Sequence, residues 1–165
     1  MITVIQNGDM VKRTRITREL LFFLAVFLSL AECGRAQIQT PQANLIRVEI
    51  GGLRSDKGQV FCTLYSSPDG FPKKSEKATA HFNSTISDKQ AVCGFSGVAP
   101  GTYAVSVFHD ENSNGKLDTN LMGIPREGVG ASNGARGHFG PPKFDDAAFH
   151  FSGGQLDLKI TVNYL

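Results

Sequence analysis

The alternation of apolar and polar positions predicts most of the secondary structure of this chain. Residues 45–50 and 59–65 both alternate, and a period of two residues indicates a strand that is buried on one face. The turn-forming residues 55–58 lie between these segments, so we expect the two strands to form a hairpin. The apolar positions on their buried faces are Ile46, Val48, Ile50, Val60, Cys62 and Leu64.

Further strands are expected along the rest of the chain. Residues 78–82 and 90–95 give weaker strand patterns, whereas residues 102–108 are rich in β-branched and aromatic side chains and follow a Pro-Gly turn. Alternation returns at residues 156–162, and no segment after residue 36 keeps helical spacing over about ten residues. The pattern therefore predicts an all-β fold, a β-sandwich of about seven strands. Tyr103 is expected to form a tyrosine corner, in which its hydroxyl bonds to upstream backbone.

The N-terminal segment has the pattern of a secretory signal peptide. Basic residues precede an apolar run at residues 20–30, and Gly34 and Ala36 supply the small side chains of a cleavage site. The run is shorter than the roughly 20 residues that span a membrane, so we expect no transmembrane anchor after cleavage. A lipoprotein, with Cys33 as the acylated residue, and a true start at Met10 are alternatives.

These features predict a signal peptide at residues 1–36 and a single secreted or periplasmic domain at residues 37–165. Of the 17 basic and 15 acidic residues, five and three precede residue 37, which leaves 12 of each in the mature chain. A net charge of zero without a Lys/Arg cluster argues against nucleic acid and anionic membrane surfaces as partners. The partner stays unknown. In an oxidising compartment Cys62 and Cys93 are expected to form a disulfide.

Residues 110–145 show no strand or helix period, and loops of this length are usually functional or disordered. Seven glycines permit tight backbone paths, and six apolar residues are spaced to pack onto the sandwich. We therefore expect a long, Gly-rich capping loop packed against the strands. The apolar residues are Leu117, Leu121, Met122, Ile124, Val129 and Phe139.

The first part of this cap has the oxygen spacing of a calcium loop. Alternate residues carry side-chain oxygens, a glycine allows the sharp turn, and hard cations take six to eight oxygen ligands. Leu121 replaces the twelfth-position glutamate of an EF-hand, so any calcium site is weak. Asn, Asp and Gly also form turns without a metal, and both interpretations are open. The candidate ligands are Asp110, Asn112, Asn114, Asp118 and Glu127, together with the backbone carbonyl of Lys116.

A second hypothesis is a hydrolase-like enzyme in which His109 acts with a carboxylate of the cap as acid-base groups. Ser132 would complete a triad, but it lies in a turn sequence and no G-x-S-x-G motif is present. A transition-metal site at His109, His138 and His150 has no compact ligand spacing. We therefore assign no catalytic residue, and the sequence favours a non-enzymatic binding or structural module.

Three motifs together resemble one known family. They are YAVSVFHDENSNGKLDTN, GIPREGVGASN and FGPPKFDDAAF, and they are accompanied by the Gly-Thr-Tyr entry turn at residues 101–103 and by Tyr164 near the C-terminus. In these features the chain is similar to the uncharacterised bacterial exported family called domain of unknown function twenty-one forty-one. The resemblance implies an exported prealbumin-like or immunoglobulin-like sandwich, and it implies no reaction.

Overall fold

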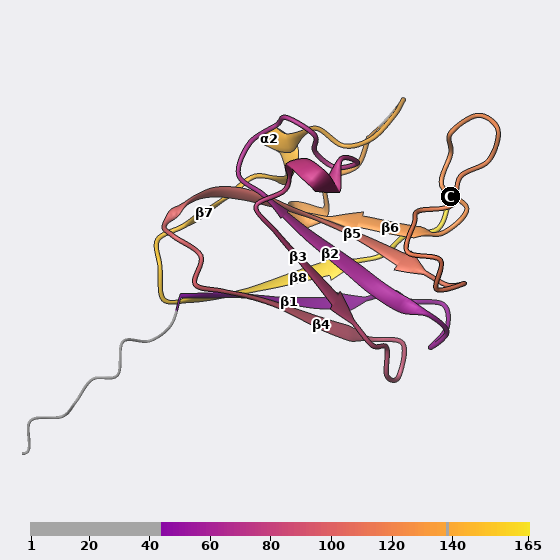
Figure 1. The fold of residues 1–165 in the computed structure, drawn as a ribbon, viewed down its shortest axis with the longest axis horizontal. Coiled ribbons are helices and arrows are strands. Elements are labelled where there is room, and N and C mark those ends of the chain that lie inside the picture. Colours follow the sequence, from indigo (N-terminus) through magenta and orange to yellow (C-terminus); the bar gives the residue numbers. More distant parts are fainter. Residues whose placement is uncertain (1–43, 138) are drawn as a thin grey trace, which may run out of the picture. The chain divides into compact units, whose positions relative to one another are not determined.

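Two β-sheets form the fold of the described residues (Figure 1). The computed structural model describes residues 44–137 and 139–165. The predicted signal peptide, the alternative start at Met10, the alternative acylation at Cys33 and the cleavage point before Gln37 lie outside the described residues. So does His138.

The first sheet has the strand order β4-β1-β8, with β1 antiparallel to β4 and parallel to β8. The second has the order β3-β2-β5-β6, and β7 pairs with the beginning of β5. The strands are β1 (Leu45–Gly51), β2 (Gln59–Tyr65), β3 (Ala80–Ser84), β4 (Ala91–Ser96), β5 (Gly101–Asp110), β6 (Gly128–Ala131), β7 (Phe149–Phe151) and β8 (Gln155–Thr161). The described residues also contain three short helices, η1 (Ser75–Lys77), η2 (Ser132–Gly134) and α2 (Phe144–Ala147).

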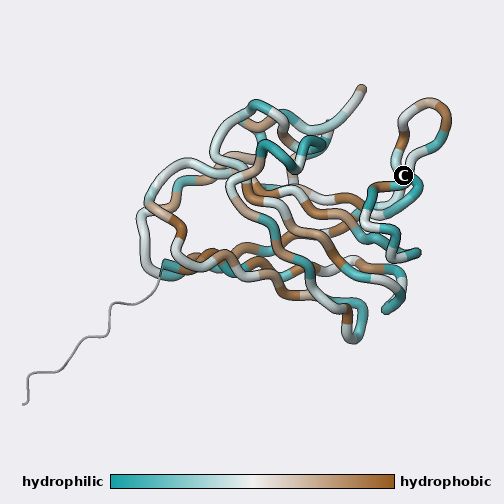
Figure 2. Tube along the Cα trace, viewed as in Figure 1, coloured by the Kyte–Doolittle hydropathy of each residue, from teal (hydrophilic) through white to brown (hydrophobic). Residues whose placement is uncertain are grey.

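The core lies between the two sheets and is built from the alternating positions. In β1 every second residue is buried, and the same period continues in β4 and in most of β5. Figure 2 shows the hydrophobic positions following the strands. The predicted all-β sandwich is therefore confirmed, with eight strands in the described residues in place of about seven. None of the helices in the described residues has the length and apolar character needed to cross a bilayer.

The predicted hairpin between the first two strands is wrong. β1 pairs with β4 and β8, whereas β2 pairs with β3 and β5, so the turn at residues 55–58 carries the chain from one sheet to the other. The apolar faces of both strands were identified correctly. The apolar side chains of β1 and β2 belong to the same buried cluster, although the two strands lie in different sheets. Alternation fixes which face is buried, and it leaves the pairing partner open.

The predicted cap contains a strand that the sequence pattern did not indicate. β6 pairs with β5 through the register His109↔Gly128 to Ser106↔Ala131. Two of its four residues are glycines, which carry no strand signal. A Cβ on Gly128 would lie 2.4 Å from Cγ1 of Val162, and one on Gly130 would lie 2.8 Å from Cγ2 of Ile160. The glycines are needed because the C-terminal segment approaches this strand closely.

The cap is also less packed than expected. Leu121 and Phe139 are fully exposed, and Met122 and Ile124 are exposed as well. Leu117 and Val129 are half-buried. The spacing of apolar residues in this segment therefore did not predict burial, because the hairpin that carries Leu121 and Met122 projects away from the sheets.

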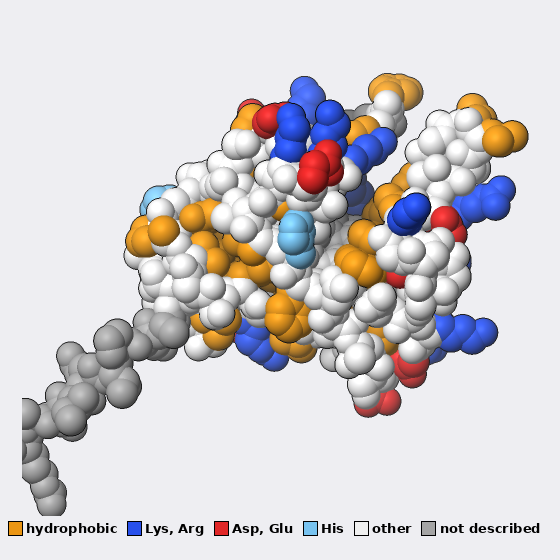
Figure 3. All heavy atoms as spheres, viewed as in Figure 1, with side chains coloured by type: hydrophobic (Ala, Val, Ile, Leu, Met, Phe, Trp, Pro, Cys, Tyr) orange, Lys and Arg blue, Asp and Glu red, His pale blue; other side chains and the backbone are white. Residues whose placement is uncertain are grey.

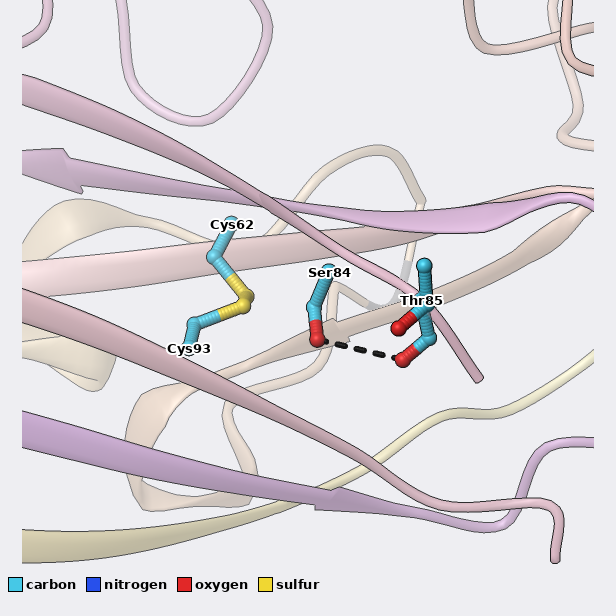
Figure 4. The surroundings of a disulfide bond; sticks show 4 residues. All are labelled: Cys62, Ser84, Thr85 and Cys93. Carbon is cyan, nitrogen blue, oxygen red and sulfur yellow. Dashed lines mark hydrogen bonds between the residues drawn. A yellow bond between two sulfur atoms is a disulfide. The ribbon is translucent and has the colours of Figure 1, made fainter. Parts of the chain in front are cut away.

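Two predicted covalent and hydrogen-bonded links are confirmed. Cys62 of β2 and Cys93 of β4 form a disulfide with a Cα–Cα distance of 6.5 Å, which joins the two sheets (Figure 4). The hydroxyl of Tyr103 donates to the carbonyl oxygen of Ala99 at 2.9 Å. This is the geometry of a tyrosine corner at the entry to β5.

Candidate functional site

The candidate site lies at the end of β5, where the chain leaves the sheet and returns as β6. Because His109 and Gly128 face each other in the register of these strands, the segment from Asp110 to Glu127 begins and ends at the same place. We call residues 110–127 the site loop. Asp110 and Glu127, its two ends, are both buried. The strand pairing therefore brings together carboxylates that are 17 positions apart in the sequence.

Asp110 organises the first turn of the site loop. One carboxylate oxygen accepts a hydrogen bond from the backbone N–H of Asn114 at 3.1 Å, and the other accepts from Gly115 at 2.8 Å. The side-chain oxygen of Asn112 also accepts from the N–H of Asn114, at 3.1 Å, and that of Asn114 accepts from Lys116 at 2.8 Å. The predicted ligand oxygens at 110, 112 and 114 thus cap successive backbone N–H groups of one turn.

Asp118 lies opposite the two asparagines. Its Oδ2 accepts from the side-chain amide of Asn112 at 2.7 Å, and its Oδ1 accepts from that of Asn114 at 3.2 Å. Two neutral amide donors therefore occupy the positions at which a cation would contact this carboxylate. The side chain of Lys116 is exposed, and only the backbone of this residue was a candidate ligand.

Glu127 closes the site loop from its far end. Its Oε1 accepts from the backbone N–H of Glu111 and its Oε2 from that of Asp118, both at 2.9 Å. The loop does fold back onto this third carboxylate, as the calcium hypothesis requires. However, no group of three or more His, Cys, Asp or Glu side chains in the described part of the chain is arranged to hold a metal ion. Any cation here must take part of its ligand set from amide and backbone oxygens.

His109 lies next to the site loop and is completely buried. Its Nε2 lies 2.7 Å from the carbonyl oxygen of Lys57, which can only accept, so Nε2 carries a hydrogen. Its Nδ1 lies 2.6 Å from the hydroxyl of Tyr164, and in the neutral imidazole it accepts that hydroxyl hydrogen. The Tyr164 oxygen in turn accepts from the backbone N–H of Arg54 at 3.1 Å. Every polar atom of the imidazole is satisfied within the fold.

An ion pair lies beside the Tyr164 ring, which packs against this histidine. The guanidinium of Arg54 forms a bidentate ion pair with Glu111, with Nε to Oε1 at 2.8 Å, and lies over the Tyr164 ring with 4.4 Å between Cζ and the ring centroid. The hydrogen bond from Arg54 lowers the pKa of the Glu111 carboxyl. Burial raises the pKa of the Tyr164 hydroxyl. Glu111 thus faces Arg54 and contributes no side-chain oxygen to the site loop.

The groups of the hydrolase hypothesis are separated. Ser132 is buried, and its hydroxyl donates to the carbonyl oxygen of Ala147 at 2.6 Å while accepting from the N–H of Val105 at 2.9 Å. That hydroxyl holds η2 and α2 against β5. Of the candidate transition-metal ligands, His150 is exposed on β7, at the opposite end of β5 from His109. An acid-base site at His109 needs an exposed cleft, whereas this side chain has no exposed surface.

The residues around His109 were missed by sequence reasoning. The residues that contact His109 or its partner come from two segments far from it in sequence; they are Arg54, Lys57 and Tyr164. The sequence predicted none of these contacts, and Tyr164 was singled out only as a feature of the family resemblance. The only available signal was a polar histidine at an inward position of a strand, which demands buried partners. It does not say where those partners lie.

The fold is all-β, and the site loop, which is rich in side-chain oxygens, connects the neighbouring strands β5 and β6. The chain belongs to the family described as uncharacterized protein conserved in bacteria (DUF2141), whose model matches residues 48–159. This match confirms the resemblance noted in the three sequence motifs. No curated protein and no solved structure matches the chain.

Proposed function

We propose that this chain is an exported, non-enzymatic binding or structural module whose site loop takes up one calcium ion weakly. The observation that carries the proposal is the hydrogen-bond network of the site loop. Four oxygen-bearing side chains chosen from sequence spacing belong to it, together with Glu127 from the far end of the loop, and its two buried carboxylates lie at the ends of the loop. These side chains are Asp110, Asn112, Asn114, Asp118 and Glu127.

Calcium binding requires a small rearrangement around Asp118. The amides of Asn112 and Asn114 present their NH₂ groups to this carboxylate, so a cation must displace both donors and take amide oxygens in their place. A carbonyl-type oxygen has two lone pairs, so each amide oxygen can ligate a cation as well as accept a hydrogen bond. Losing two amide–carboxylate bonds lowers the affinity, and we expect a dissociation constant of about 0.1 to 1 mM, as in extracellular modules.

Export is supported by two independent features. The first 36 residues have the pattern of a cleavable signal peptide, and disulfides persist in oxidising compartments such as the periplasm and the extracellular space.

Calcium titration tests the proposal directly. Isothermal calorimetry should detect binding, and the free energy of unfolding should rise by about 1.4 kcal/mol at a tenfold excess over the dissociation constant. Asp118→Asn removes the carboxylate and should abolish both effects. Asp145→Asn, which changes an exposed carboxylate on α2, is the matched control and should retain them. Absence of binding heat together with a melting temperature that ignores millimolar calcium would show that the site loop is held by its turns alone.

A further inference from the structure

The hairpin at residues 119–125 forms the outermost part of the site loop and is closed by a β-bridge and by hydrogen bonds within its own turn. Thr119 and Pro125 form a β-bridge at its base, and the N–H of Gly123 donates to the carbonyl oxygen of Asn120 at 2.9 Å. The side-chain oxygen of Asn120 accepts from the backbone N–H groups of Met122 and Ile124 at 2.9 and 3.0 Å. Gly123 has φ of +76°, which suits a glycine at this turn.

This turn fixes apolar side chains at its apex. Leu121 and Met122 occupy the two central positions, with 107% and 84% of their surface exposed, and Ile124 follows with 42% exposed. Figures 2 and 3 show the hydrophobic end of this loop projecting from the sheets. Exposed apolar residues are ordinary when scattered singly, but a hydrogen-bonded turn that presents two of them together at a projecting tip indicates that the tip contacts an apolar surface outside the protein.

Positive charge accompanies the apolar tip. Lys116 and Arg126 are exposed on either side of the hairpin, and neither forms a salt bridge with a carboxylate of residues 44–137 or 139–165. The acidic side chains of the site loop are turned inward, because Asp110, Asp118 and Glu127 accept hydrogen bonds from the loop itself. The zero net charge of residues 37–165 argued against anionic surfaces for the chain as a whole, whereas the uncompensated side chains beside this one hairpin are cationic.

A second segment repeats this composition. Phe139, in the segment before α2, is fully exposed. Arg136 and Lys143 are exposed on either side of it. Figure 3 shows the ends of both segments as separate hydrophobic projections. Phe139 would extend a contact made by the hairpin.

We propose that residues 119–125 insert their apex into the interfacial layer of an anionic lipid bilayer, with Lys116 and Arg126 contacting the lipid headgroups. A stable protein interface buries about 800 Å² on each partner and needs a broad, complementary face. The hairpin offers two or three side chains on a narrow, convex projection, which suits shallow insertion between headgroups. Exposed cations behind an apolar tip match an anionic surface. The proposal does not depend on calcium, because the hairpin is formed by its own hydrogen bonds.

Vesicle binding by the purified protein tests this proposal, in buffer with a calcium chelator so that the calcium proposal is tested separately. The protein should sediment with vesicles of phosphatidylethanolamine and phosphatidylglycerol and much less with phosphatidylcholine vesicles. Replacing both apex residues, Leu121→Ser with Met122→Ser, should lower partitioning about a hundredfold, because each inserted side chain contributes about a factor of ten. Val92→Ser, an exposed apolar position on β4, is the matched control and should bind as the native protein does.

The chain contains no tryptophan, so Leu121→Trp gives a single reporter at the apex. Its emission should shift to shorter wavelength on binding anionic vesicles and should be quenched by brominated lipid tails. Lys116→Gln with Arg126→Gln should weaken binding to anionic vesicles without altering the melting temperature. The proposal is overturned if the vesicles do not bind the protein, if the apex variant binds undiminished, or if the reporter shifts only on self-association or on contact with another protein.

Discussion

Removing the hydroxyl of Tyr164 should destabilise the fold well beyond the effect of an ordinary surface change. In Tyr164→Phe the ring remains, so the stacking of Arg54 and the packing against Gly128 are retained. What is lost is the hydrogen bond to Nδ1 of His109, which is buried with no exposed surface. A buried acceptor left without a donor costs about 1 to 3 kcal/mol. The Arg54 N–H, in an exposed segment, regains water and adds little.

Urea unfolding followed by circular dichroism measures this cost, with the disulfide intact in both proteins. The free energy of unfolding should fall by about 1 to 3 kcal/mol while the dependence on urea stays unchanged. Tyr103→Phe is the matched control, since its hydroxyl donates to the exposed Ala99 carbonyl, which water can solvate. Its cost should be the smaller of the two. A loss below about 0.5 kcal/mol for Tyr164→Phe, the range of surface substitutions, would refute the assignment of this hydroxyl as the donor to His109.

Two further predictions concern covalent processing. Cys62→Ala with Cys93→Ala opens a loop with a sequence separation of 31, and the chain-entropy relation gives a loss of about 3 to 4 kcal/mol in unfolding free energy. A urea midpoint unchanged from that of the oxidised protein would contradict that value. The exported protein should begin at Gln37, as measured by mass spectrometry of its N-terminal peptide. Recovery of acylated Cys33 or of an uncleaved Met10 start would reject the proposed cleavage site.

The sequence predicted which face of each strand is buried better than it predicted which strands pair with one another. Ile46, Val48 and Ile50 are buried as expected, because alternation is a local property of each strand. One of the two partners of β1 is β8, which is remote in the chain, and no local pattern indicates a parallel pairing of that kind. The need for glycine at position 128 could not be predicted for a related reason. A side chain there would collide with Val162 and Tyr164, which belong to the distant C-terminal segment.

The site loop shows the same division between local and distant information. The spacing of Asp110, Asn112 and Asn114 predicted a tight turn, and their side chains do cap its backbone. The inward position of Glu127 depends on the pairing of β5 with β6. The sequence did not predict β6, because two of its four residues are glycines, which carry no strand signal. The exposed apex at Leu121 was missed because apolar residues in a loop were assumed to reach the core.

The parallel pairing of β1 with β8 makes the order of synthesis matter for this chain. Leu45 pairs with Gln155, and the side chain of Asn44 accepts a hydrogen bond from Gly154, 110 positions later. A chain that leaves the ribosome N-terminus first therefore exposes one edge of β1 until β8 has been made. Pairings this distant in sequence form slowly, because a large loop must close first. A ribosome that stalls before β8 is complete would release a chain with an open, apolar strand edge, a substrate for chaperones and proteases.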